Sequence, residues 1–197
     1  MLRIEPAGLA DLPGVYRVCL MTDDAGGDST GRYRDQDLPG HVFAGPYLAW
    51  GRETQLVVVD RDGVAGYLLS TDDTLAFDAW AEEQWWPPLR VRYPLTDERW
   101  EEARFIRRIH APEHRAAELL QAYPAHFHID LLPRTRGSGM GRRLIERLLS
   151  ELRERGVPGL HMGVDGRNTN AIGFYEHLGF RTLEQQPSGL TMGMSLD

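Results

Sequence analysis

The sequence has a single cysteine, no long apolar run and no excess of positive charge, and each shortage excludes a class of protein. The lone Cys19 rules out an internal disulfide and favours a reducing compartment. No segment reaches the roughly 18 consecutive apolar residues of a transmembrane helix, and the N-terminal residues lack a signal-peptide pattern. A net charge of −7 argues against nucleic acid as the main partner. We therefore expect a cytoplasmic protein that binds neither nucleic acid nor membrane.

Length and composition fit one globular domain over residues 1–197, with 42% hydrophobic and 26% charged side chains. Apolar spacing and turn residues predict its elements. In chain order these are strand Leu2–Pro6; helix Ala10–Met21; a helix over Gln36–Gly51, interrupted at Pro39-Gly40 and near Gly45-Pro46; a hairpin of Leu56–Asp60 and Val64–Ser70; helices Thr74–Trp86 and Thr96–His110, separated by Pro87-Pro88 and Tyr93-Pro94; strand Phe127–Leu132; helix Met140–Arg155; and strand Leu160–Val164, followed by a helix.

The most informative segment is a glycine-rich loop between the strand Phe127–Leu132 and the helix Met140–Arg155. Gly137, Gly139 and Gly141 permit a tight turn and leave main-chain N–H groups unshielded. Because a helix begins there, its unpaired amides and the positive end of its dipole favour a bound anion. The loop therefore predicts a seat for a phosphate or pyrophosphate, with a purely structural turn as the alternative.

Known glycine motifs narrow the choice. A dinucleotide-binding loop of an NAD(P) oxidoreductase needs a third glycine where Arg142 stands, and a P-loop needs Gly-Lys-Ser/Thr where Gly141 is followed by Arg142 and Arg143. The pattern Arg/Gln-x-x-Gly-x-Gly/Ala is met by Arg136, Gly139 and Gly141. This segment resembles the acyl-CoA pyrophosphate loop of the GCN5-related N-acetyltransferases, the GNAT superfamily.

A second block supports the same resemblance. It is similar to the family signature Asn-x-x-Ala-Ile-x-Phe-Tyr-x-x-Leu-Gly-Phe at Asn168, Ala171, Ile172, Phe174, Tyr175, Leu178, Gly179 and Phe180. The resemblance implies an α/β GNAT fold: a mixed central sheet splayed between its fourth and fifth strands, with helices on both faces. Residues 71–125 exceed a minimal domain of this family. We expect them to form a helical insertion before the fourth strand, with its own small core, that walls the acceptor pocket.

A narrower resemblance rests on Pro46-Tyr47-Leu48, Gly66-Tyr67-Leu68, Trp86 to Pro94, and His128-Ile129-Asp130. These are similar to the acetyltransferase-like C-terminal domain of eukaryotic O-GlcNAcases and its stand-alone bacterial relatives. That eukaryotic domain is regarded as a pseudo-acetyltransferase with a degraded CoA loop, whereas the loop is intact here. The resemblance implies transfer of acetyl from acetyl-CoA to an amine by direct attack in a ternary complex. A catalytically inactive acetyl-CoA-binding module is the alternative. No covalent intermediate is expected, because Cys19 is far in sequence from the cofactor motif.

The resemblance also assigns residues to acetyl-CoA. In the family, main-chain groups of the central strand pair with the pantetheine arm and loop amides hold the pyrophosphate. The residues expected to bind the cofactor are Leu131, Leu132, Arg136, Gly137, Ser138, Gly139, Met140, Gly141, Arg142, Asn168 and Tyr175. An N–H near Leu131 is expected to polarise the thioester carbonyl, and Asn168 to cap the following helix.

Two side chains are candidates for proton transfer. Tyr175 occupies the position of the family's general acid at sulfur; the alternative is a buried core tyrosine with a satisfied hydroxyl. Strand alternation places His126, His128 and Asp130 on one face. Asp130 is the candidate general base, with Asp165 a second carboxylate near the same crevice. The histidines could instead hydrogen-bond within the sheet.

The acceptor site is the least defined. Asp23 and Asp24 follow the first helix, where the family forms acceptor sites, and could attract a cationic amine. Trp86 of the aromatic insertion is expected to line the same pocket. The pair His110 and His114 does not predict a metal site, because an intervening proline disfavours a helix carrying both imidazoles. Protein lysine, N-terminal amine, polyamine and aminoglycoside acceptors stay open, as do monomer and homodimer.

Overall fold

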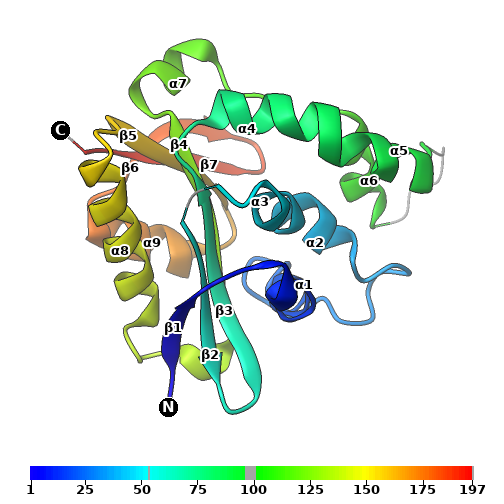
Figure 1. Cartoon of the computed structure of the whole chain (residues 1–197), viewed down its shortest axis with the longest axis horizontal. Helices are drawn as coiled ribbons and strands as arrows, with labels where there is room; N and C mark the ends of the chain where they lie inside the picture. Colours follow the sequence, from blue (N-terminus) through cyan, green and yellow to red (C-terminus); the bar gives the residue numbers. More distant parts are fainter. Residues whose placement is uncertain (53, 96–100, 197) are drawn as a thin grey trace.

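The computed structural model describes residues 1–52, 54–95 and 101–196 and contains a central sheet of seven strands in the order β1-β2-β3-β4-β5-β7-β6 (Figure 1). The strands are β1 (Arg3–Pro6), β2 (Gln55–Asp60), β3 (Gly63–Thr71), β4 (Ala125–Leu131), β5 (Gly159–Asp165), β6 (Arg181–Gln186) and β7 (Gly189–Ser195). Neighbouring strands run antiparallel except β4 and β5, which are parallel. The predicted mixed sheet and hairpin are confirmed.

The parallel pair is short. Ala125 pairs with Leu160 and His126 with His161, and in the described part of the sheet the register goes no further. The remainder of β4 and β5 therefore diverges, which confirms the predicted splay between the fourth and fifth strands. This opening lies at the centre of the sheet, where a ligand can reach main-chain groups of β4.

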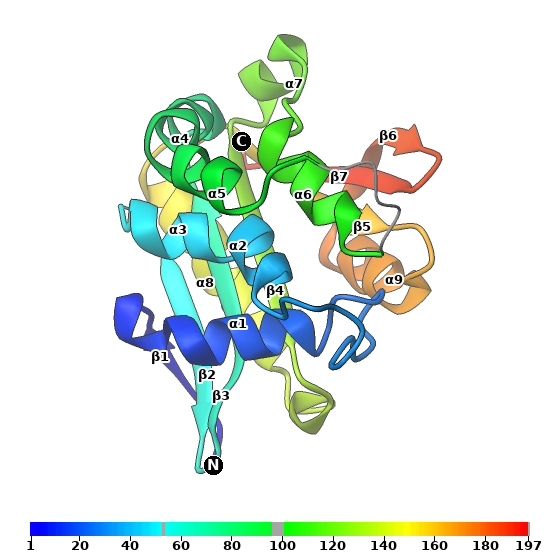
Figure 2. The ribbon, with the colours of Figure 1, turned by 90° about the vertical axis from the view of Figure 1, so that its right-hand side faces the viewer.

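Helices cover both faces of the sheet. They are α1 (Leu12–Leu20), α2 (Leu38–Phe43), α3 (Gly45–Trp50), α4 (Thr74–Trp80), α5 (Trp86–Arg92), α6 (Ala103–His110), α7 (Ala117–Ala122), α8 (Met140–Glu154) and α9 (Thr169–Leu178). α8 and α9 lie on one face; α1, α2 and α3 lie on the other, with α4, α5 and α6 stacked beyond them (Figures 1 and 2). Within the described ranges, no helix is long and apolar enough to span a membrane.

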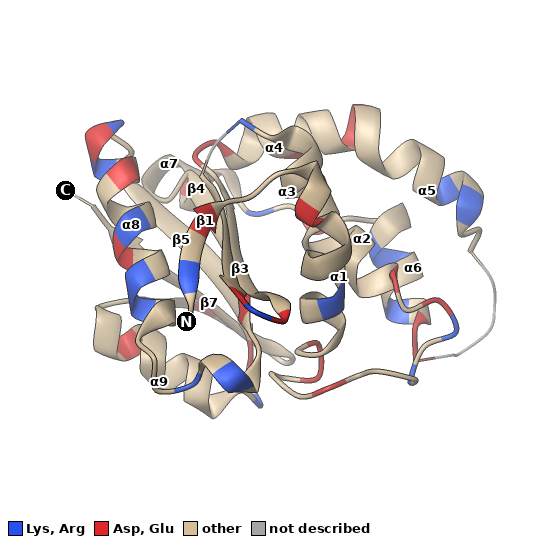
Figure 3. Cartoon of the chain, turned by 60° about the horizontal axis from the view of Figure 1, so that its bottom comes forward, with Lys and Arg blue, Asp and Glu red and all other residues tan. Residues whose placement is uncertain are grey.

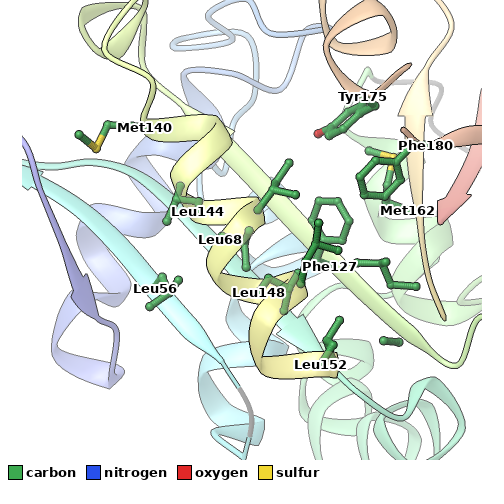
Figure 4. Close-up of a cluster of buried hydrophobic side chains, with 14 of the residues drawn as sticks. Leu56, Leu68, Phe127, Met140, Leu144, Leu148, Leu152, Met162, Tyr175 and Phe180 are labelled. Carbon is green, nitrogen blue, oxygen red and sulfur yellow. The ribbon is translucent and has the colours of Figure 1, made fainter. Parts of the chain in front are cut away.

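The main hydrophobic core lies between the sheet and α8. Leu144, Leu148 and Leu152 recur at helical spacing on α8 and are all buried. They belong to one cluster with Phe127 of β4 and Leu160 of β5, so the core extends beneath both diverging strands (Figure 4). Side-chain packing on this face therefore joins the two halves of the sheet where main-chain pairing stops.

The insertion forms helices, as predicted, but their buried side chains share one hydrophobic cluster with α1, α2 and the segment between them instead of forming a core of their own. Trp86, Phe105 and Ile109 belong to this cluster, together with Tyr33 and Leu38 from the segment before α3. It covers the outer side of α2 and so builds a wall above the central strands.

Two predicted helix breaks are wrong. Pro87-Pro88 does not separate helices: α4 continues through a π-helical segment into α5, and the prolines occupy the first turn of α5. Likewise Pro39 lies in the first turn of α2, whereas the predicted interruption near Gly45-Pro46 is confirmed by the break at Ala44 between α2 and α3. In a first turn the missing proline N–H costs no helical hydrogen bond. Of the predicted helix Thr96–His110, residues 96–100 lie outside the described residues, and α6 begins at Ala103.

Candidate active site

The glycine loop presents unpaired main-chain amides next to the end of β4. Gly137 and Gly139 adopt left-handed backbone angles, with φ of +71° and +74°, and no atom lies within 4 Å of where a Cβ would stand. Among the described residues, the N–H groups of Gly137, Gly139, Gly141 and Arg142 find no hydrogen-bond acceptor. The last two sit in the first turn of α8, where the helix dipole is positive. This donor set fits a diphosphate.

Other loop residues differ from expectation. The Ser138 N–H donates to the Thr135 carbonyl (3.2 Å), and the Met140 N–H lies 3.4 Å from Ser138 Oγ. These two amides therefore have partners within the loop, and their part in holding the cofactor stays a prediction. Arg136 is exposed, and Arg142 pairs with a glutamate one turn along α8 (3.6 Å). Both guanidiniums lie at the surface beside the loop.

The end of β4 offers one main-chain donor towards the opening. The Leu132 N–H donates to the Ala65 carbonyl of the neighbouring strand β3 (2.9 Å). Successive N–H groups of a strand point to opposite sides, so the Leu131 N–H faces the β5 side, where the ladder has ended. The pairing of the main chain around Leu131 and Leu132 with the pantetheine arm stays a prediction, in which the Leu132 amide takes no part because it is occupied within the sheet.

A cavity of about 460 Å³ occupies the space between the diverging strands and the helical insertion. His126, His128 and Asp130 line it from β4, and so do Phe127 and Ile129, so side chains from both faces of the strand border the opening. Tyr175 of α9 lines another wall and Trp86 the insertion side. Residues 136–142 are not part of the lining. The anion seat and the cavity are therefore neighbours along β4 rather than a single pocket.

Asp130 is held in a small hydrogen-bonded network on the cavity floor. The Tyr67 hydroxyl donates to Asp130 Oδ2 (2.6 Å) and lies 3.1 Å from His128 Nδ1. Burial raises the pKa of Asp130, partly opposed by His128 and by the hydrogen bond from Tyr67. Burial lowers the pKa of His128, which therefore stays neutral near pH 7. Among the described residues the carboxylate forms no ion pair with an arginine, and it is equipped to take a proton.

Tyr175 is buried at 5% exposure, with its ring against Phe127 and Phe180. Its hydroxyl points away from Phe180 and Met162 (Figure 4). Burial, and secondarily the charge of Asp130, raises the pKa of Tyr175, so the phenol stays protonated. Among the described side chains it has no hydrogen-bond partner, in contrast to the alternative of a core tyrosine with a satisfied hydroxyl.

Asn168 caps α9, as predicted, and sits at the mouth of the cavity. Its side-chain oxygen accepts the Ala171 N–H (3.1 Å), and Asn168 also lines the cavity. The cap fixes the start of the helix that carries Tyr175.

The two acidic residues after α1 are already paired within the chain. Asp23 lines the cavity, but its carboxylate contacts Arg104 and accepts from Tyr33 (2.5 Å). Asp24 lies outside the lining and pairs with Arg167 (2.9 Å) and Arg32. Among the described residues, both carboxylates of this loop thus have partners, and neither is left unpaired to attract a cationic amine. Asp165, the second carboxylate, lines the cavity and pairs with Arg167 (2.8 Å).

Cys19 is nearer to the site than its place in the sequence suggested. It lines the cavity from α1 and is 1% exposed. Burial and the neighbouring Asp130 raise the pKa of its thiol well above the usual value. The thiol is therefore neutral and a poor nucleophile. Over the described ranges, no three His, Cys, Asp or Glu side chains group closely enough to hold a metal ion.

Sequence reasoning missed several residues that line the cavity or lie directly behind its lining. Tyr67 was noted only as part of a resemblance, although it is the cross-strand partner of Asp130. Arg108, Glu113 and Arg115 line the cavity from α6 and the segment after it. The register between β3 and β4 could have identified Tyr67 as the neighbour of Asp130. The arginines could not be placed, because their position depends on how the insertion folds over the sheet.

Comparison with known proteins gives consistent results. The Acetyltransferase (GNAT) family profile matches residues 29–180. The crystal structure of SsHAT superposes with a TM-score of 0.91 and 35% identity, covering 100% of this chain and 98% of that one. Protein O-GlcNAcase of Mus musculus is 27% identical over 182 residues, which is 89% of this chain and 20% of that protein. The chain thus spans about one fifth of this O-GlcNAcase. An acetyltransferase from Salmonella typhimurium, solved with acetyl-CoA, shares the fold at a TM-score of 0.57 and 18% identity.

Proposed function

The chain belongs to the GNAT acetyltransferase family, and we propose that it transfers the acetyl group of acetyl-CoA directly to an amine held in the cavity. The observation that carries the proposal is the arrangement along β4. Unpaired amides of the glycine loop lie beyond its end, an open main-chain edge follows, and Asp130 and Tyr175 line the adjoining cavity. Acetyl-CoA supplies the activated thioester.

Each step of the proposed transfer uses a group with a suitable protonation state. Asp130 accepts a proton from the bound ammonium, and the free amine attacks the carbonyl carbon. The Leu131 N–H stabilises the negative charge that develops on the carbonyl oxygen. The new C–N bond forms as the C–S bond breaks, Tyr175 donates its proton to the departing sulfur, and the nitrogen then loses its second proton, which restores the neutral phenol. A neutral Cys19 is consistent with direct transfer in a ternary complex.

The test monitors free thiol while the protein is mixed with acetyl-CoA and a panel of amines. The chain contains no lysine, so thiol release cannot come from acetylation of its own lysine side chains. We expect saturable, acceptor-dependent release. Binding of acetyl-CoA without release for any amine would instead indicate a binding module.

Tyr175→Phe separates catalysis from binding. The substitution removes the acid but keeps the ring packed against Phe127 and Phe180. We expect kcat to fall by about 10²- to 10⁴-fold, the range of general acid catalysis, while calorimetry reports an unchanged Kd for CoA. An unchanged kcat would remove Tyr175 from the proposed mechanism.

A further inference from the structure

The cavity carries opposite charges at two places. On the floor, Asp130 is bonded to Tyr67 and lies 3.8 Å from a neutral His128. In the roof, α6 and the segment that follows it bring two arginines, Arg108 and Arg115, to the lining. Figure 3 marks the basic residues of α6 beside the other helices of the insertion. A ligand between floor and roof would meet a carboxylate at one end and guanidiniums at the other.

A column of stacked planar groups connects the two ends. The Arg108 guanidinium carbon lies 5.3 Å from the centre of the Phe43 ring. Phe43 stacks on His128, with 5.4 Å between centroids and 7° between planes, and His128 in turn stacks on Tyr67 (5.7 Å, 23°). Tyr67 holds Asp130 at the base. Arg108 is thus fixed above the same rings that position Asp130, and only two short steps separate it from His128.

The two arginines share a single carboxylate. Glu113 lies 3.0 Å from Arg108 and 3.9 Å from Arg115, and its side chain is 53% exposed. The other acid that faces Arg115, Asp78, is bonded to His114 (3.3 Å). Among the described residues, Glu113 is the carboxylate within ion-pair distance of these guanidiniums; it is half exposed, and its contact with Arg115 is too long for a good hydrogen bond. A second anion can therefore take the place of Glu113 at this arginine pair.

We propose that the acceptor is a short amine carrying an anionic group, a carboxylate or a phosphate. Its ammonium lies at Asp130 and its anion at Arg108 and Arg115, with Glu113 displaced towards solvent. The inference rests on the proposed function, because the ammonium must lie where Asp130 can deprotonate it. The apolar middle of such a molecule runs along Phe43, between the two charges.

The first experiment compares acceptors that differ only in the anion. Thiol release from acetyl-CoA is measured with 4-aminobutanoate against butylamine, 6-aminohexanoate against hexylamine, and phosphoethanolamine against ethanolamine. We expect kcat/KM to favour at least one anionic member by on the order of tenfold or more, because charge-assisted hydrogen bonds to guanidinium are lost in its neutral partner. Whether a carboxylate or the phosphate gives the larger ratio identifies the anion. Equal kcat/KM within every pair overturns the inference while leaving the acetyltransferase in place.

Variants locate the preference. Arg108→Gln and Arg115→Gln should raise KM for the anionic acceptor by about tenfold with little change in kcat. Glu113→Gln should lower that KM several-fold, because the competing carboxylate is removed. Arg107→Gln, the same change on the exposed side of α6, is the matched control and should do neither. An unchanged KM in all three cavity variants, or an equal rise for the neutral amine, contradicts the proposed seat.

Equilibrium binding keeps the two proposals distinguishable. Calorimetry on the CoA-loaded protein measures the affinities of 6-aminohexanoate and hexylamine in the absence of turnover, and so tests the anion site directly. Tighter binding of 6-aminohexanoate, abolished in Arg108→Gln, supports the seat even if no amine is acetylated, in which case only the proposed catalysis fails. Binding of the two amines with equal affinity overturns the seat.

Discussion

Removing the Tyr67 hydroxyl should move the pH dependence of acetyl transfer, because that hydroxyl stabilises the ionised form of Asp130. It donates to Asp130 Oδ2 at 2.6 Å, and the Tyr67 ring is fully buried. Hydrogen bonds to charged groups contribute about 1.5–3 kcal/mol, and one pKa unit corresponds to about 1.4 kcal/mol. Tyr67→Phe should therefore raise the pKa of Asp130 by roughly one to two units, adding to the rise already caused by burial.

Asp130 acts as a base only when it is ionised. The acid limb of the pH profile of kcat/KM should therefore shift to higher pH by the same amount, roughly one to two pH units. The assay is thiol release measured across pH, with CoA affinity followed in parallel and expected to stay constant. Tyr16→Phe is the matched control: it removes a buried hydroxyl that lies 3.0 Å from His41 Nδ1, outside the cavity lining. The reasoning would be refuted if the acid limb of the pH profile did not move in Tyr67→Phe, or if it moved equally in the control.

Three further predictions concern the cofactor seat, acid stability and the core. Gly139→Ala forces a side chain into a φ of +74°; it should raise the Kd for CoA measured by calorimetry, whereas Gly173→Ala, in open space on α9, should leave it unchanged. Burial lowers the pKa of His161 from 6.5 to about 4, so the folded state resists protonation that the unfolded chain accepts. Urea unfolding should show stability falling as pH drops from about 6.5 towards 4, with His161 contributing up to about 3 kcal/mol of the loss, and His161→Gln should lose less over that interval. Leu148→Ala, at a fully buried position, should lower the free energy of unfolding by about 2–5 kcal/mol in the same assay; a loss below about 1 kcal/mol would contradict its central place in the core.

The central part of the fold could be predicted because its signals are local. Alternation along β4 placed His128 and Asp130 on one face, and both line the cavity; glycine spacing placed the loop before α8. Both features depend on residues that are neighbours in sequence, so the spacing of apolar residues and the choice of turn residues are enough to predict them.

Other parts depend on contacts that no local pattern encodes. The predictions did not extend to β6 and β7; β6 is an edge strand with largely exposed polar residues and little apolar alternation. The bond from Tyr67 to Asp130 follows from the register between β3 and β4. The pairing of Asp24 with Arg167 joins residues 143 positions apart, so a loop expected to attract an amine is neutralised from a distant turn.

The short ladder between β4 and β5 has a mechanical consequence. Since main-chain pairing joins the two halves of the sheet at two positions, their separation is governed by the leucines of α8 and the side chains of both strands that pack beneath them. Shortening a leucine of α8, such as Leu144 or Leu148, should therefore change the width of the gap although neither leucine lines the cavity.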